Sequence, residues 1–177
     1  TEVTGLVLKH NYWQNQAVSL TYARRDKLFH AHRRLLKRLE AEGELDRKLE
    51  YLPTSKELHE RKTLGKGLTR PELCILLSFS KIFLSKKLMN SAFLNDPILE
   101  EAYLSYFPEQ IRSGFQQACL KHPLKKEITS TVVTNVIVDT LGPTFVNEVH
   151  ELSQMGEDRI VKAIWIVRTF LNLKQFE

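Results

Sequence analysis

Apolar residues recur along most of this chain at spacings of three and four, the period of an amphipathic helix. Between about Gln14 and Glu42 the recurring positions are Val18, Tyr22, Leu28, Phe29, Leu35, Leu36 and Leu39. The pattern predicts one long helix over about 14–42, and Gly43 follows it as a residue suited to ending a helix. Four basic residues would then form a stripe on the opposite side of this helix: Arg24, Lys27, Arg34 and Arg38.

Capping residues and prolines indicate where further helices begin. Thr54 with Glu57, and Thr69 with Glu72, have the spacing of a capping box. The first pair predicts a short helix that ends at Gly65, and the second an apolar helix that runs to about Met89. The same kind of signal predicts further helix starts near Pro97, Pro108, Pro123, Pro143 and Gly156.

Segment 128–138 is rich in β-branched residues, which favour strands. Its apolar positions nevertheless have helical spacing, and no other segment alternates as a partner strand would: Ile128, Val132, Val133, Val136 and Ile137. We therefore predict a helix from about Leu124 to Leu141. The complete pattern predicts an all-α fold, an irregular bundle of about eight helices around one core, with residues 1–177 forming a single helical domain.

Composition narrows the class of protein. The chain has 177 residues, 42% of them hydrophobic and 27% charged, and no apolar run long enough for a membrane span. Cys74 and Cys119 both lie in apolar segments, which predicts two reduced, packed thiols in a cytoplasmic protein. The chain begins with Thr1 rather than Met, so we expect a fragment of a longer polypeptide.

Charge is unevenly distributed. Residues 1–90 carry a net +8 and residues 91–177 a net −3, within a total of +5. A basic half is typical of a solvated face, of a surface that contacts an acidic partner, or of a protein that binds nucleic acid.

One segment is a candidate anion site. The turn 64–70 is glycine-rich and leads into a predicted helix, whose N-terminus would attract anions. Lys62, Lys66 and Arg70 would add positive charge there. The spacing is neither that of a P-loop nor that of a dinucleotide-binding fold, so a plain turn before a capped helix remains the alternative.

Signatures of catalysis are missing from the sequence. There is no G-x-S-x-G motif, no recognisable Cys–His protease pattern, and no pair of histidines at the i, i+4 spacing of a metal site. We therefore predict no catalytic, cofactor-binding or metal-binding residue.

Two features leave alternatives open. Lys81 lies in the apolar segment 73–88 and is either exposed along a narrow stripe or part of a buried salt bridge. The last helix, from about Gly156, carries apolar residues on more than one face: Ile160, Val161, Ala163, Ile164, Trp165, Ile166, Val167, Phe170, Leu171 and Leu173. Such a helix is either central to the bundle or covered by another domain or subunit.

Several short motifs, taken in order, resemble one family. They are Asn11-Tyr12 with Gln14 and Ala17; Leu52-Pro53 with Glu57-Leu58 and Arg61; Gly67-Leu68-Thr69-Arg70-Pro71-Glu72-Leu73 with Leu76-Leu77 and Lys81; Tyr106-Phe107-Pro108; Lys126-Glu127-Ile128 with Thr131 and Asn135; and Gly142 with Phe145. Over nearly its whole length the chain resembles the C-terminal helical region of the large bacterial NAD-dependent glutamate dehydrogenases.

The resemblance implies a parent enzyme that uses NAD to convert L-glutamate to 2-oxoglutarate and ammonia. In that family the substrate lysines and the dinucleotide-binding segment lie upstream of this region, so no catalytic residue is carried over and no cofactor is expected here. The implied partner is the catalytic portion of the parent chain, with subunit contacts through the last helix, and no membrane. The alternative hypothesis is a stand-alone basic module that binds nucleic acid or another polyanion.

Overall fold

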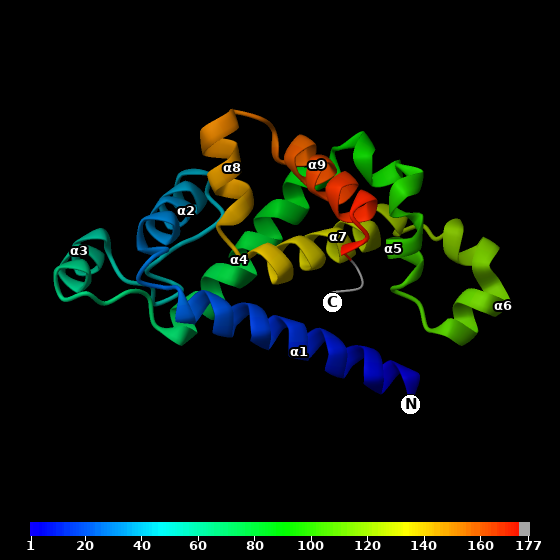
Figure 1. Ribbon diagram of the computed structural model, residues 1–177, viewed down its shortest axis with the longest axis horizontal. Helices are drawn as coiled ribbons and strands as arrows, with labels where there is room; N and C mark the ends of the chain where they lie inside the picture. Colours follow the sequence, from blue (N-terminus) through cyan, green and yellow to red (C-terminus); the bar gives the residue numbers. More distant parts are fainter. Residues whose placement is uncertain (174–177) are drawn as a thin grey trace. The chain divides into compact units, whose positions relative to one another are not determined.

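A computed structural model describes residues 1–173 of the chain, and Figure 1 draws its helices in chain order from blue to red. The described residues form nine α-helices and two short 3-10 helices and contain no strand. The α-helices are α1 (Glu2–Ala23), α2 (Phe29–Ala41), α3 (Ser55–Thr63), α4 (Arg70–Met89), α5 (Glu100–Leu104), α6 (Glu109–Leu120), α7 (Lys125–Leu141), α8 (Phe145–Ser153) and α9 (Glu157–Phe170); the 3-10 helices are η1 (Ala92–Asn95) and η2 (Pro97–Leu99). The predicted all-α fold is confirmed.

The chain divides into two compact units. Unit 1 consists of residues 1–83 and 138–145, and unit 2 of residues 84–137 together with those from 146 onward. The division falls within α4 and within α7, so each of these helices contributes residues to both units.

Unit 1 is built around a leucine-rich core. On α2 the buried side chains recur every three or four residues, as the sequence pattern requires, and the connection to α3 and the first turns of α4 add further leucines. The buried members are Phe29, Leu35, Leu36, Leu39, Leu45, Leu52, Leu58, Leu68, Leu73, Leu76 and Phe83.

Unit 2 has a smaller cluster where α5 and α6 meet. It consists of Tyr103, Leu104 and Cys119, with three partly buried residues packed against it: Phe107, Leu120 and Ile128. On α9, Ile160, Val161 and Trp165 are also buried.

Capping residues, glycines and prolines predicted most helix ends correctly. The Thr54 hydroxyl accepts a hydrogen bond from the Glu57 N–H at 3.3 Å, and the Glu57 carboxylate accepts one from the Thr54 N–H at 2.7 Å. This capping box starts α3, and Gly65 follows the helix with a φ of +66°. Segment 128–138 lies within α7, so the prediction of a helix rather than a strand there is confirmed.

The single long helix predicted over about 14–42 is wrong. The structure has two helices, α1 and α2, with a turn over residues 24–28 between them. The Gly67 N–H donates to the Asp26 carboxylate at 3.1 Å, so a loop 41 residues away binds the chain in this turn. The apolar period lapses here, because Arg25 and Asp26 stand three and four residues after Tyr22, but no glycine or proline marks a helix end.

The basic stripe expected on that helix is absent for the same reason. Arg24 and Lys27 lie in the turn, not on a helix shared with Arg34. Arg38 pairs with Glu42 at 3.0 Å, and its guanidinium lies 5.1 Å from the centre of the Phe83 ring.

The two cysteines differ in exposure. Cys119 is buried, as predicted, and its carbonyl accepts a hydrogen bond from the Tyr103 hydroxyl. Cys74 is a free thiol but is exposed, so the prediction that it packs in the core is wrong. It shares the outer side of α4 with Ser78, which is also exposed, while Leu73, Leu76 and Leu77 are turned into the core.

Candidate functional site

The loop between α3 and α4 contains the candidate anion site predicted from the sequence. Arg70, at the start of α4, donates from Nη2 to the Ser19 hydroxyl of α1 at 3.1 Å. Lys62, at the end of α3, lies close enough to His30 of α2 for its positive charge to lower the pKa of that histidine. Lys66 is exposed in the loop between them. Binding of an anion by these three residues stays a prediction.

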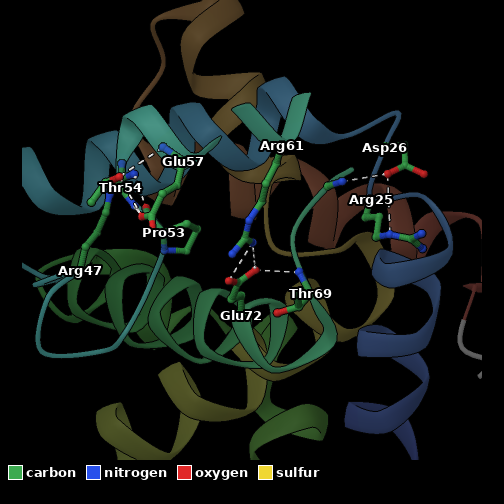
Figure 2. Close-up of polar contacts among 10 residues, drawn as sticks. Arg25, Asp26, Arg47, Pro53, Thr54, Glu57, Arg61, Thr69 and Glu72 are labelled. Atoms are coloured by element: carbon green, nitrogen blue, oxygen red, sulfur yellow. Dashed lines mark hydrogen bonds and ion pairs between the residues drawn. The ribbon is translucent and has the colours of Figure 1, made fainter. Parts of the chain in front are cut away.

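A carboxylate of the chain already occupies the N-terminus of α4. Glu72 accepts from the Thr69 N–H at 2.7 Å, and both of its oxygens accept from Arg61 Nη1, at 2.9 and 2.8 Å (Figure 2). Burial alone would raise the pKa of Glu72, but the hydrogen bonds from Arg61 and Thr69 outweigh it and hold that pKa below its usual value. The sequence predicted this cap from the Thr69 and Glu72 spacing, but nothing in it identified Arg61 as the partner.

Gly67 fastens the same loop to the turn between α1 and α2. Besides the bond from its N–H to Asp26, the chain approaches Arg25 so closely that a Cβ at Gly67 would lie 3.0 Å from the Arg25 carbonyl oxygen. Figure 2 shows Arg25 and Asp26 beside this part of the loop. Together with the Glu72 contacts, these bonds link three segments of unit 1.

Replacing Gly67 with alanine is therefore expected to lower the free energy of unfolding by about 1–3 kcal/mol, because the added methyl group meets backbone that has little room to move. Urea unfolding of both proteins measures the difference. Gly114 is the matched control: it lies in α6 and has no atom within 4 Å of its missing Cβ, so Gly114→Ala is expected to be neutral or stabilising. Equal stability of the Gly67→Ala variant and the parent would contradict the close approach.

Lys81 forms a buried salt bridge, which was the second of the two alternatives that the sequence left open. Its Nζ lies 2.7 Å from Asp139 Oδ1, and the two side chains are only 14% and 12% exposed. Burial raises the pKa of Asp139, while the charges of Lys81 and of nearby His10 act in the opposite direction. The amine is thus engaged in a largely buried ion pair that joins α4 to α7 within unit 1.

His32 is the most deeply buried titratable ring in unit 1. It is 1% exposed, and neither ring nitrogen has a hydrogen-bond partner among the described residues. Burial lowers its pKa to about 4, so the ring is neutral at pH 7. No signal in the sequence identified this burial.

A surface hollow of about 1030 Å³ lies over the connection from α2 to α3. Its lining includes residues 43–52 and Phe79. Sequence reasoning missed it, since no periodicity or cap marks it.

Among residues 1–173, no three His, Cys, Asp or Glu side chains are grouped so that they could hold a metal ion. None of the helices in that same part is both long and apolar enough to cross a membrane.

Comparison with known proteins identifies the family. Residues 65–177 match the family described as the C-terminal region of glutamate dehydrogenase. The chain belongs to this glutamate dehydrogenase family. The match includes the loop at Gly67, the Glu72 cap and the Lys81–Asp139 pair, whereas the hollow falls mostly before residue 65.

Three relatives are similar along almost the whole chain. The chain is 41% identical over 171 residues to the NAD-specific glutamate dehydrogenase of Pseudomonas aeruginosa, and this covers 97% of the chain but 11% of the relative. For the NAD-specific glutamate dehydrogenases of Halomonas elongata and Mycobacterium tuberculosis, identity is 36% and 33%, over 97% and 96% of the chain and 11% and 10% of the relative. The chain therefore spans about a tenth of the length of these curated relatives. No solved structure matches it.

Proposed function

We propose that this chain is the non-catalytic helical domain of an NAD-dependent glutamate dehydrogenase and that it packs against the catalytic portion of the parent protein. The parent would convert L-glutamate, NAD and water to 2-oxoglutarate, ammonia and NADH in the cytoplasm. The catalytic residues and the NAD site would lie outside these 177 residues. Support comes from the NAD-specific glutamate dehydrogenases to which the chain is similar.

The exposed apolar side of α9 is the observation that carries the packing role. One side of this helix is buried through Ile160, Val161 and Trp165. On the other side Ile166 is 46% exposed, Val167 52% and Phe170 86%. Apolar residues grouped at helical spacing on a surface are typical of an interface. We infer that the outer side of α9 contacts the rest of the parent chain or a neighbouring subunit.

The polar groups of unit 1 favour a structural role over a catalytic one. Glu72 is held by Arg61 and Thr69, and Asp139 is held by Lys81. Both carboxylates therefore bind partners within the fold, and they do not face each other across a cleft. Such contacts hold helices together and do not assemble an acid–base pair.

Two measurements test this proposal. The isolated chain is expected to show helical circular dichroism, to form no NADH from glutamate and NAD, and not to bind NAD at micromolar concentrations. Turnover or micromolar NAD binding by this chain alone would contradict the proposal.

In the full-length enzyme, the double variant Val167→Ser and Phe170→Ser is expected to lower the inactivation temperature by about 5 °C, because it weakens an interface.

The control for the second measurement is Leu152→Ser, which removes an exposed leucine of α8 that is 87% exposed and lies outside α9. It is expected to leave the inactivation temperature unchanged. If the α9 double variant behaves like this control, the outer side of α9 does not contact the parent protein.

A second candidate is a module that binds a polyanion, and one observation favours it. The pKa of His30 is lowered chiefly by the charge of Lys62, and also by burial and by Arg33 and Arg34, so these cations gather near one another on α2 and α3. Binding through phosphates is strongest at low salt. A gel-shift assay with duplex DNA at low salt separates the two candidates, because the absence of any shift contradicts polyanion binding.

A further inference from the structure

The hollow over the α2–α3 connection is preformed by contacts within the loop. Arg47 is 8% exposed; its Nη2 lies 2.7 Å from the Glu40 carboxylate, and its Nη1 donates to the Pro53 carbonyl at 3.1 Å. Asp46 Oδ1 accepts from the Lys48 and Leu49 N–H groups at 2.8 and 3.1 Å. Figure 2 shows Arg47 reaching Pro53 next to the start of α3. A partner that binds here would not have to order the loop first.

Apolar side chains form both the floor and the rim of this hollow. Leu45 and Leu52 are 6% exposed and belong to the core of unit 1, and Phe79 of α4 also lines the hollow. At the rim, Leu49 is 72% exposed and Tyr51 is 93% exposed. An exposed tyrosine beside a hollow with an apolar floor is typical of an anchor in a binding surface.

The backbone at Tyr51 is itself unusual. Its φ is +53°, in the left-handed region, which costs a residue with a side chain about 1–2 kcal/mol. Residues held in this region are concentrated at sites that bind ligands or partners. The surrounding bonds, including the Leu52 N–H to the Arg47 carbonyl at 2.8 Å, hold the chain in this conformation and leave the ring facing solvent.

Carboxylates outnumber cations around the hollow. The lining contains Glu40, Glu44, Asp46 and Glu50 but only Arg47 and Lys48 as basic residues. Arg47 and Glu40 neutralise each other, which leaves three carboxylates and one lysine around the hollow. This negative region occurs in a chain whose net charge is +5. Its electrostatic complement is a cation, and its apolar floor and rim require apolar side chains on the same partner.

We propose that the hollow is a docking site for a cationic amphipathic protein segment, in which leucine-like side chains pack on Tyr51 and Leu49 and lysines or arginines meet the surrounding carboxylates. This inference goes beyond the proposed function and does not depend on it. An open hollow with protruding rim residues presents its contact area to a protein segment that lies across it and does not enclose a small molecule.

The test uses the 177-residue chain and a fluorescent 14-residue peptide of leucine and lysine arranged with helical spacing. Fluorescence anisotropy is expected to show saturable binding that weakens as salt is added, because opposite charges attract at close range. Two further peptides separate the contributions. The first contains only lysine and lacks apolar side chains, and the second has glutamate in place of every lysine and lacks positive charge. Each is expected to bind at least about tenfold more weakly than the leucine–lysine peptide.

Tyr51→Gly is the informative variant. Glycine adopts a positive φ without strain, so this change removes the ring while leaving the backbone relaxed. Binding is expected to weaken by about tenfold. Urea unfolding verifies that the variant folds. Leu152→Ser, which removes an exposed apolar side chain of α8 elsewhere in the chain, should bind like the parent.

The charge contribution is tested in the same way. Glu50→Gln, at the hollow, is expected to weaken binding about threefold and to reduce its dependence on salt. Glu60→Gln removes the same charge from exposed α3, outside the hollow, and should have no effect.

Three outcomes overturn the proposal. The first is Tyr51→Gly binding the peptide as tightly as the parent, and the second is equal affinity for the glutamate–leucine peptide. The third comes from sedimentation of the chain without peptide: a dimer that Tyr51→Gly abolishes would show that a second copy, not a cationic segment, occupies the hollow.

Discussion

Replacing Lys81 with methionine is expected to lower the free energy of unfolding by about 3 kcal/mol at pH 7, because it leaves the Asp139 carboxylate largely buried without its cation. Methionine keeps most of the aliphatic length, so the loss measures the charge rather than a cavity. Urea unfolding at pH 7 checks this value. The double variant Lys81→Met, Asp139→Leu is expected to regain most of the stability, since replacing both partners of a buried pair leaves no unpaired charge.

The pH dependence provides an independent check. Burial raises the pKa of Asp139 above its ordinary 3.8, so the folded chain holds this proton more tightly than the unfolded chain does. The stability that Asp139 contributes is therefore fully present below pH 3.8 and is lost as the pH rises through the folded pKa. Without Lys81 this fall becomes larger, so the cost of Lys81→Met should shrink at low pH, where the carboxyl group is neutral.

Lys162 is the matched control for this experiment. It forms an ion pair with Asp96 at 3.0 Å, but its side chain is 48% exposed. Lys162→Met is therefore expected to cost less than about 1 kcal/mol at any pH. Similar losses for both lysine variants would show that burial does not increase the contribution of the Lys81 pair to stability.

Replacing His32 with leucine is expected to remove a loss of stability that develops in acid. The pKa of His32 is lowered by burial from 6.5 to about 4, so between these values the unfolded chain binds the proton and the folded chain does not. Stability contributed by this residue is fully present above pH 6.5 and decreases by about 3 kcal/mol as the pH falls to 4. Urea unfolding at pH 7, 5.5 and 4.5 measures this slope in the parent and the variant.

The leucine variant should also be more stable at pH 7, by about 1–2 kcal/mol, because the two ring nitrogens of His32 are buried with no hydrogen-bond partner in the part of the chain that the structure describes. The difference between variant and parent isolates His32 from Asp139 and other groups that titrate in the same range. His59 is exposed on α3, so His59→Gln is expected to retain the acid-induced loss. An unchanged pH slope after His32→Leu would show that the ring is protonated in the folded chain.

Helices and their ends follow from interactions between residues that are close in the sequence. Thr54 and Glu57 are three positions apart, and both hydrogen bonds of their capping box form in the structure. Segment 128–138 is helical although its β-branched residues favour strands. Its apolar residues have helical spacing, and burying that apolar face stabilises the helix more than the strand preference opposes it.

The break between α1 and α2 shows where such reasoning fails. Neither glycine nor proline interrupts residues 24–28, and Leu28 and Phe29 resume the apolar pattern directly after the polar positions Arg25 and Asp26. The turn instead makes contacts with Gly67, whose N–H binds Asp26 and whose missing side chain allows the approach to Arg25. These contacts depend on a loop that the sequence places 41 residues away.

The candidate site was anticipated only in part. The glycine-rich turn and its basic residues were identified from the sequence, but their contacts were not: Arg70 binds Ser19, and the helix N-terminus is occupied by Glu72. The hollow beside Tyr51 had no local signal at all. It depends on a left-handed residue, on a buried arginine and on Phe79 from α4, which come together only after the chain has folded.

The amino-acid sequence alone determined the all-α class, most helix ends and the glutamate dehydrogenase family, because periodicity, caps and motifs involve residues within a few positions of one another. Only the tertiary structure decided that α1 and α2 are separate helices, that Lys81 is paired and that Cys74 is exposed. It also decided that an acidic hollow forms beside Tyr51. These features depend on contacts between segments that are far apart in the sequence. No single segment contains both partners of such a contact, so local patterns do not predict it.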